Sequence, residues 1–336
     1  MSTMSMSWLG RALRAVALVG MLVGGAAAAQ AQQQPLGADN NPTARPMSGL
    51  TAPAEADMLR ALRGVQGNVT IPDRKAATLV QPQGRDWRET MGGTIRAWGA
   101  WLVFGMIAVV TAFYLIRGSI MIDGGRSGRM IERFTEFERF NHWMTASAFI
   151  TLALTGLNVT YGRHLLMPLL GPEVFSAWSA FAKLLHNFVA FPFILGLVIM
   201  LVIWIGNNFP NRYDWQWLAQ GGGIFVKGVH PPAKKFNLGQ KLVFWSVIIF
   251  GGIIALSGIM LLFPFWFGTM ETQQLMAVLH SIFSLILIAV IIAHIYIGTL
   301  GMEGAWDAMY TGQVDERWAK EHHSVWAAEA KAGGDD

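Results

Sequence analysis

The sequence predicts an all-α integral membrane protein, and three observations support this fold class. Of its 336 residues, 53% are hydrophobic and only 14% are charged, whereas soluble domains carry about 25% charged residues. Five apolar stretches are each long enough to cross a bilayer as a helix, which takes about 20 residues. Tryptophan and phenylalanine are plentiful, at 14 and 20 residues, as expected for aromatic belts at the two membrane surfaces.

The N-terminal residues 1–31 have the pattern of a secretory signal peptide. Arg11 and Arg14 precede a short apolar run, and small residues follow up to Ala31, where cleavage is expected. An uncleaved anchor is the alternative, although the run is short for a membrane span. Both interpretations export the next segment, 32–96, whose content of Gln, Pro, Gly and Ala predicts a poorly ordered arm.

The distribution of positive charge predicts how the chain crosses the membrane. The apolar stretches lie at residues 98–116, 140–160, 182–206, 242–263 and 276–300. Lys and Arg concentrate in the connections 117–139 and 207–241 and in the C-terminal tail, which the positive-inside rule places in the cytoplasm. Five crossings that start from an exported arm also end inside. We therefore expect a multi-pass protein of the bacterial inner membrane, with a periplasmic arm and a cytoplasmic C-terminus.

Four of the eight histidines lie within the predicted spans. This topology puts His186 and His280 near the outer face of the membrane, and His142 and His294 near the inner face. His280 and His294 belong to one helix and are 14 residues apart. This spacing puts their side chains within about 40° of each other around the helix axis and about 21 Å apart along it. Each depth therefore holds two imidazoles from different helices.

Two imidazoles at one level are what the axial ligation of a b-type haem requires. Cysteine is absent, which excludes cysteine-ligated iron–sulfur clusters and c-type haem attachment on this chain. A single membrane histidine is more often a packing or interface residue, but four that pair by depth favour two stacked b haems. The other histidines lie in loops or in the tail and are not expected to be ligands: His164, His230, His322 and His323.

Small residues in the fourth span allow two interpretations. Gly251, Gly252 and Gly258, together with Ser257, fit either close helix packing or room beside a macrocycle. Packing is the commoner reason for glycine in a membrane helix, so it is the favoured interpretation here.

Residues 129–326 resemble the gamma subunit, the cytochrome b subunit, of respiratory formate dehydrogenases. The segments that carry the resemblance are RFNHWMTASAFITLALTGL (139–157), LLHNFVAFPFILG (184–196), KKFNLGQKLVFWSVIIFGG (234–252), LHSIFSLILIAVIIAHIYIG (279–298) and VDERWAKEHHSVW (314–326). The resemblance implies a four-helix transmembrane di-haem cytochrome b bundle at 129–306. One extra N-terminal transmembrane helix, 97–117, would precede it, and a cytoplasmic tail, 307–336, would follow it.

The resemblance also implies a role in electron transfer. His186 and His280 match the ligands of the outer haem, and His142 and His294 match those of the inner haem. Formate would be oxidised by a separate catalytic subunit containing molybdenum or tungsten. Electrons would then pass through an iron–sulfur subunit to the outer haem, the inner haem and membrane quinone. The chain itself is expected to hold no catalytic residue and to bind no nucleic acid.

A quinone site is implied beside the inner haem. The matching positions in this sequence are Asn237, Gly239, Gln240 and His294. A polar turn that caps the next helix is the alternative explanation for the first three. Two other functions also stay open: a cytochrome b anchor of a hydrogenase or thiosulfate reductase, and a non-haem transporter or structural membrane anchor.

Overall fold

The computed structural model describes residues 87–332 of the chain. Residues 98–332 belong to one compact unit. The described part contains five helices that are long and apolar enough to cross a membrane, so the predicted all-α membrane architecture is confirmed. Each helix is longer than its apolar run, because a helix satisfies its own backbone hydrogen bonds and can continue past the hydrocarbon with polar residues.

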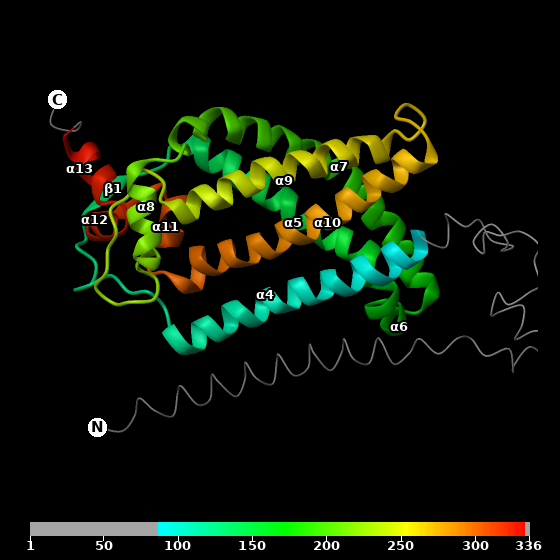
Figure 1. Ribbon diagram of the computed structural model, residues 1–336, viewed down its shortest axis with the longest axis horizontal. Coiled ribbons are helices and arrows are strands. Elements are labelled where there is room, and N and C mark those ends of the chain that lie inside the picture. The colour runs from blue at the N-terminus through cyan, green and yellow to red at the C-terminus, as the bar shows by residue number, and fades with distance from the viewer. Residues whose placement is uncertain (1–86, 333–336) are drawn as a thin grey trace, which may run out of the picture. The chain divides into compact units, whose positions relative to one another are not determined.

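The five long helices are α4 (Arg96–Arg117), α5 (Glu136–Leu165), α7 (Pro172–Trp204), α9 (Leu238–Leu262) and α10 (Met270–Tyr296). The shorter elements are η2 (Thr90–Ile95), β1 (Met130–Glu132), α6 (Met167–Leu170), η3 (Ile205–Asn207), α8 (Arg212–Ala219), η4 (Gly221–Gly223), η5 (Ile297–Gly301), α11 (Ala305–Tyr310), β2 (Gln313–Asp315), α12 (Glu316–His322) and α13 (Ser324–Ala332). Figure 1 shows α8, α11, α12 and α13 gathered at one end of the bundle and α6 at the opposite end.

The first long helix begins earlier than the sequence predicts. The poorly ordered arm was expected to reach residue 96, but the chain is already helical from Trp87. Arg88 and Glu89 form part of this first turn, since polar residues are tolerated where a helix extends beyond the hydrocarbon. The rest of the predicted arm, and the signal peptide predicted over 1–31, lie outside the described residues.

Two helical hairpins, α5 with α7 and α9 with α10, make up the bundle. Small residues bring the helices close together, as is usual in membranes. A Cβ atom added to Gly196 of α7 would overlap the Thr145 side chain of α5. Gly251 of α9 lies against Leu197 of α7, where an added Cβ would be 3.0 Å from Leu197 Cδ1. Packing therefore explains Gly251, as expected.

The loop after α4 and the segment after α10 pair at the end of the bundle where α9 begins. Strand β1 is antiparallel to β2, with Ile131 opposite Val314, and Val314 is fully buried. The tail predicted to start at residue 307 is thus a folded part of the protein as far as residue 332. Such pairing between distant segments leaves no periodic signal in either of them.

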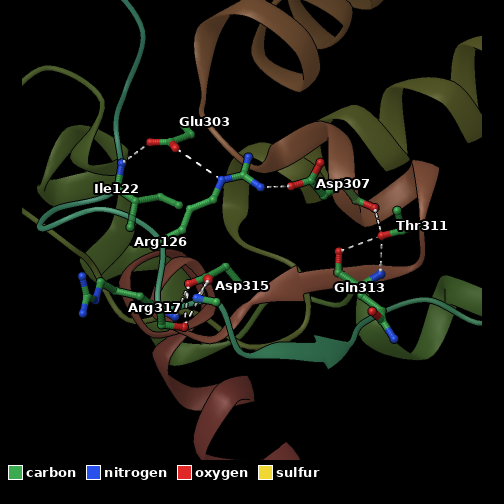
Figure 2. Close-up of polar contacts among 10 residues, drawn as sticks. Ile122, Arg126, Glu303, Asp307, Thr311, Gln313, Asp315 and Arg317 are labelled. Carbon is green, nitrogen blue, oxygen red and sulfur yellow. Dashed lines mark hydrogen bonds and ion pairs between the residues drawn. The ribbon is translucent and has the colours of Figure 1, made fainter.

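Charged side chains hold these same two segments together. Glu303 accepts hydrogen bonds from the Ile122 amide and from Arg126, whose guanidinium also pairs with Asp307 at 2.8 Å (Figure 2). The Asp315 side chain caps the start of α12 by accepting a hydrogen bond of 2.9 Å from the Arg317 amide. Lys235 of the segment 207–241 pairs with Glu138 at 2.8 Å, so the segments 117–139 and 207–241 and the tail meet at one end of the bundle. That this end faces the cytoplasm stays a prediction.

A buried arginine joins the tail to the loop before α9. Arg133 donates hydrogen bonds to the Lys235 carbonyl at 2.6 Å and to His323 Nε2 at 3.0 Å, while His323 Nδ1 lies 2.8 Å from the Lys234 carbonyl. Burial lowers the pKa of Arg133 to about 9 and, with the charge of Arg133, lowers the pKa of His323 well below its usual value. His323 is therefore neutral, and its role is structural.

Candidate functional site

The outer pair of histidines joins the two hairpins near the end of the bundle that holds α6. His186 of α7 and His280 of α10 have ring centres 6.2 Å apart, with an angle of 62° between the ring planes. His186 Nδ1 lies 2.8 Å from Thr155 Oγ1 of α5, and His280 Nδ1 lies 3.2 Å from Ser257 Oγ of α9. The Nδ1 atoms are thus engaged by the neighbouring helices, which leaves the Nε2 atoms available.

The inner pair has the same spacing at the opposite end of the bundle. His142, in the second turn of α5, and His294, in the last turn of α10, have ring centres 6.2 Å apart and planes at 66°. His142 Nδ1 is buried and has no hydrogen-bond partner among the described residues. The four histidines singled out by depth therefore come together as the same two pairs that the sequence suggested.

This spacing is the one that two imidazoles need to share an iron atom. A histidine–metal bond of about 2 Å, and about 1 Å from the coordinating nitrogen to the ring centre, place two axial rings about 6 Å apart. Both pairs meet this requirement, and both combine residues of different helices, as axial ligation from opposite sides of a macrocycle demands. The donor sets thus fit two haem groups at two depths.

Ring spacing alone does not identify a haem ligand, as a third pair demonstrates. His230 and His322 also have ring centres 6.2 Å apart. However, His230 Nε2 forms an ion pair of 2.8 Å with Asp123, and both histidines lie outside the long helices. His230 therefore belongs to a polar contact between the loop before α9 and the loop after α4, and His322 Nε2 is buried without a hydrogen-bond partner among the described residues. That neither residue is a haem ligand stays a prediction.

Thr155 is not predicted from the sequence to contact a histidine, and Ser257 and Gly258 are expected to serve helix packing. An added Cβ on Gly258 would be 3.2 Å from His280 Cε1, so this glycine packs against the neighbouring helix α10 at the position of its histidine ring. Gly252, by contrast, has no atom within 4 Å of such a Cβ. A signal was present in the sequence: LALTGL at 152–157 and IALSGI at 254–259 are identical at three of six positions and differ at the others only by Leu for Ile or Thr for Ser.

The residues expected to bind quinone form the N-terminal cap of α9. The Asn237 side chain accepts a hydrogen bond of 3.0 Å from the Gln240 amide, and the Gln240 side chain accepts one of 3.1 Å from the Asn237 amide. This reciprocal pair is a capping box. The alternative explanation, a polar turn that caps a helix, is therefore realised in the structure.

The same capping box fixes the orientation of both side-chain amides. A backbone N–H can only donate, so it is the side-chain oxygens of Asn237 and Gln240 that face the cap. Their amide nitrogens are left as hydrogen-bond donors with no acceptor among the described residues. The arrangement offers two neighbouring donors at the end of the bundle where His142 and His294 lie, although no hydrogen bond joins them to His294 in the described part.

Gly239, between these two residues, accommodates an aromatic side chain. An added Cβ would be 3.1 Å from Trp217 of α8, so the glycine lets the indole lie against the start of α9. Helix α8 is anchored there by a buried ion pair between Lys241 Nζ and Asp214 of 2.7 Å. Lys241 also donates to the Phe209 carbonyl at 3.0 Å. The cap of α9 is thus enclosed by α8 and held in place by a buried charge pair.

Comparison with known proteins gives this arrangement a family. Residues 133–312 match the family model described as prokaryotic cytochrome b561. The chain is 34% identical over 205 residues to the formate dehydrogenase cytochrome b556(fdo) subunit of Escherichia coli strain K12, covering 60% of this chain and 93% of that protein. It is 27% identical over 207 residues to the nitrate-inducible formate dehydrogenase cytochrome b556(Fdn) subunit of the same strain, covering 60% and 92%.

A third relative extends the comparison to another organism. The chain is 28% identical over 198 residues to the formate dehydrogenase cytochrome b556 subunit of Haemophilus influenzae, covering 57% of this chain and 79% of that protein. Helix α4 lies before the residues that match the family model. The chain belongs to the prokaryotic cytochrome b561 family, among the membrane cytochrome b subunits of formate dehydrogenases, which are non-catalytic subunits of an oxidoreductase.

Proposed function

We propose that this protein carries electrons released from formate across the membrane, from a partner subunit on the outer side to quinone on the inner side. The observation that carries the proposal is the pair of imidazole sets, one at each end of the bundle, each with ring centres 6.2 Å apart. One set at a single depth would anchor one haem. Two sets that share helix α10, which carries both His280 and His294, supply a route between the two faces.

Haem b, when bound, carries one electron at a time, which the side chains of this protein cannot do. The chain's own residues hold the group and separate the two sites. His186 and His280 would hold the outer haem, and His142 and His294 the inner one. The apolar helices around them exclude water, so that charge is confined to the two irons.

The proposed quinone site uses the amide donors of Asn237 and Gln240. A quinone carbonyl accepts hydrogen bonds, and the capping box turns the two amide nitrogens away from the helix as donors. Gly239 and His294 complete the site that the family resemblance implied. On the proposed topology this end faces the cytoplasm, so that protons for quinone reduction would come from inside and the circuit would build a proton gradient.

Partner subunits are required because the chain has no cysteine and so cannot ligate iron–sulfur clusters through thiolates. An iron–sulfur subunit would deliver electrons to the outer histidine pair, and a molybdenum- or tungsten-containing catalytic subunit would oxidise formate in the periplasm. The outer histidine pair faces the periplasm in this proposal, because the connections rich in Lys and Arg are expected on the cytoplasmic side of the bacterial inner membrane. The names of the relatives favour formate over the hydrogenase or thiosulfate reductase alternatives.

The haem content of the purified chain tests the proposal. We expect a reduced-minus-oxidised absorption spectrum of low-spin b haem and a ratio of two haems per chain. A ratio of one or zero would contradict the proposal, because at least one histidine pair would then hold no haem.

A second prediction concerns the quinone site. Asn237→Asp keeps the side-chain oxygen that caps α9, since Asp and Asn are equally good N-caps, but it removes the amide donor. Losing one hydrogen bond typically costs about 0.5–1.5 kcal/mol, which corresponds to roughly 2- to 10-fold weaker quinone binding. Reoxidation of the haems by quinone should slow, whereas formate-driven reduction of a soluble dye by the catalytic subunit should not change.

Two further variants sharpen this test. Gln240→Glu should have the same effect as Asn237→Asp. Asn211→Asp is the matched control, because Asn211 caps α8 through the same kind of capping box and receives the same change of charge. Unchanged reoxidation in both Asn237→Asp and Gln240→Glu would mean that quinone binds elsewhere.

A further inference from the structure

The outer histidines are held by the same short motif on two different helices. LALTGL in α5 and IALSGI in α9 place a hydroxyl residue directly before a glycine. We call Thr155–Gly156 and Ser257–Gly258 the hydroxyl–glycine pairs. Thr155 contacts His186 of the helix hairpinned to α5, and Ser257 contacts His280 of the helix hairpinned to α9. The two hairpins thus present their outer histidines in the same way.

The direction of these hydrogen bonds follows from the other partners of the hydroxyls. Thr155 Oγ1 lies 2.7 Å from the Thr151 carbonyl, which can only accept, so the single hydroxyl hydrogen of Thr155 points there. The Thr155 oxygen therefore accepts a hydrogen bond from His186 Nδ1–H. His186 is then the tautomer whose Nε2 atom carries the lone pair.

The same reasoning applies on α9, with an additional partner. Ser257 Oγ donates to the Ile253 carbonyl at 2.7 Å and accepts from His280 Nδ1. His280 Nδ1 also lies 3.1 Å from the Ile254 carbonyl. Since neither oxygen has a hydrogen to give, Nδ1 must carry the hydrogen. Both outer histidines thus present a bare Nε2 to the space between the hairpins.

The glycines allow the rings to lie close enough to reach these hydroxyls. An added Cβ on Gly258 would be 3.2 Å from His280 Cε1, and one on Gly156 would be 3.5 Å from His186 Cε1. A side chain at Gly258 would press on the His280 ring, whereas a Cβ at Gly156 would make an ordinary contact with the His186 ring. Gly258 and Ser257 therefore act together on the orientation of the His280 imidazole.

The inner pair has no such arrangement around His142. Its Nδ1 atom is buried and has no hydrogen-bond partner among the described residues. A histidine that donates its Nδ1–H to an oxygen is a more basic ligand through Nε2. A more basic ligand stabilises ferric iron over ferrous iron, because the ferric ion carries one more positive charge. The hydrogen bonds of the outer pair therefore favour the oxidised state there.

We infer that Thr155 and Ser257 are positioning residues that lower the reduction potential of the haem held by the outer histidine pair. The inference rests on the proposed function, in which both histidine pairs hold haem. His186 and His280 would hold the donor haem and His142 and His294 the acceptor haem, and these groups would supply a one-electron transfer in which the donor is oxidised, the acceptor is reduced and no bond breaks. A lower potential at the outer site would favour transfer in the direction of the proposed quinone site.

Redox titration of the haem absorption spectrum of the full-length chain tests the inference. A His142→Ala background leaves the outer pair as the remaining site, so that its midpoint potential can be measured alone. In this background Thr155→Val and Ser257→Ala should each raise the midpoint potential, and the double variant should raise it further. Thr155→Ser, which restores a hydroxyl, should return the potential toward that of the parent.

Thr151→Val is the matched control. The Thr151 hydroxyl lies one turn before Thr155 on α5 and donates to the Ser147 carbonyl at 2.9 Å, so its loss should leave the potential unchanged. If the double variant keeps its haem and its potential does not move, or if Thr151→Val shifts it equally, the inference is wrong. If the double variant loses haem, the single variants provide the test. A midpoint potential that is unchanged in Thr155→Val then overturns the inference, and a potential that rises in Thr155→Val and returns in Thr155→Ser supports it.

Failure of the inference differs from failure of the proposed function. A wild-type haem ratio below two would overturn the function, whatever the hydroxyl variants do. A ratio of two with potentials that do not depend on Thr155 and Ser257 would overturn only the inference.

Discussion

Replacing His186 with alanine is expected to lower the haem content of the purified chain from two haems to one. The outer site then keeps a single axial ligand, His280, from one hairpin, and the imidazole that meets it from the other hairpin is lost. Electrons from the iron–sulfur subunit would have no acceptor at the outer face, so formate should no longer reduce the inner haem. His280→Ala should give the same result, because the two residues serve one site.

Haem analysis and stopped-flow absorption of the assembled complex measure both effects. His230→Ala is the control, because His230 belongs to a pair with the same ring spacing but is ion-paired to Asp123 outside the long helices. Its haem content should stay at two. If His186→Ala or His280→Ala keeps wild-type haem content and formate-to-quinone turnover, the assignment of the outer ligands is wrong.

Replacing Lys241 with methionine should strongly destabilise the end of the bundle that holds the proposed quinone site. Lys241 and Asp214 have side chains only 3% and 10% exposed, so the change leaves a buried carboxylate without its cation. Breaking a buried ion pair by removing one partner typically costs about 3–5 kcal/mol. Thermal unfolding of the purified protein in detergent should shift to lower temperature, and quinone binding should weaken as α8 loses its anchor beside Trp217.

A double variant separates the loss of the ion pair from a simple loss of packing. Lys241→Met combined with Asp214→Leu removes both charges and should recover most of the lost stability. Lys234→Met is the matched single control, since Lys234 reaches Glu329 at 3.9 Å with both side chains about half exposed, and such surface pairs contribute about 0–1 kcal/mol. Equal destabilisation by Lys234→Met and Lys241→Met would contradict the importance assigned to burial.

The parts of this protein that could be predicted from sequence are those with a local signal. Apolar length marked the five spans, and charge in the connections sorted their ends. The helical period then brought His280 and His294 to one face at two depths, which sufficed to pair them with His186 and His142. Helix ends were less predictable, because polar residues such as Arg88 continue a helix without any apolar signal.

The details that sequence could not provide depend on contacts between distant segments. Thr155 gains its role from His186 on the next helix, and neither residue by itself indicates the hydrogen bond. The pairing of β1 with β2 joins two three-residue strands that lie before and after the four-helix bundle in the sequence. At Asn237 the sequence left a cap and a quinone ligand as alternatives, whereas the geometry makes them compatible, because one end of the amide serves each purpose.

The contact between Arg133, His323 and the loop before α9 also has a consequence for biosynthesis. The Ala233 carbonyl accepts hydrogen bonds from the amides of Val325 and Trp326, so this loop gains its final contacts from the last helix that the structure describes. All five spans leave the ribosome before those residues do. The loop before α9 therefore gains these contacts only after all five spans have been translated.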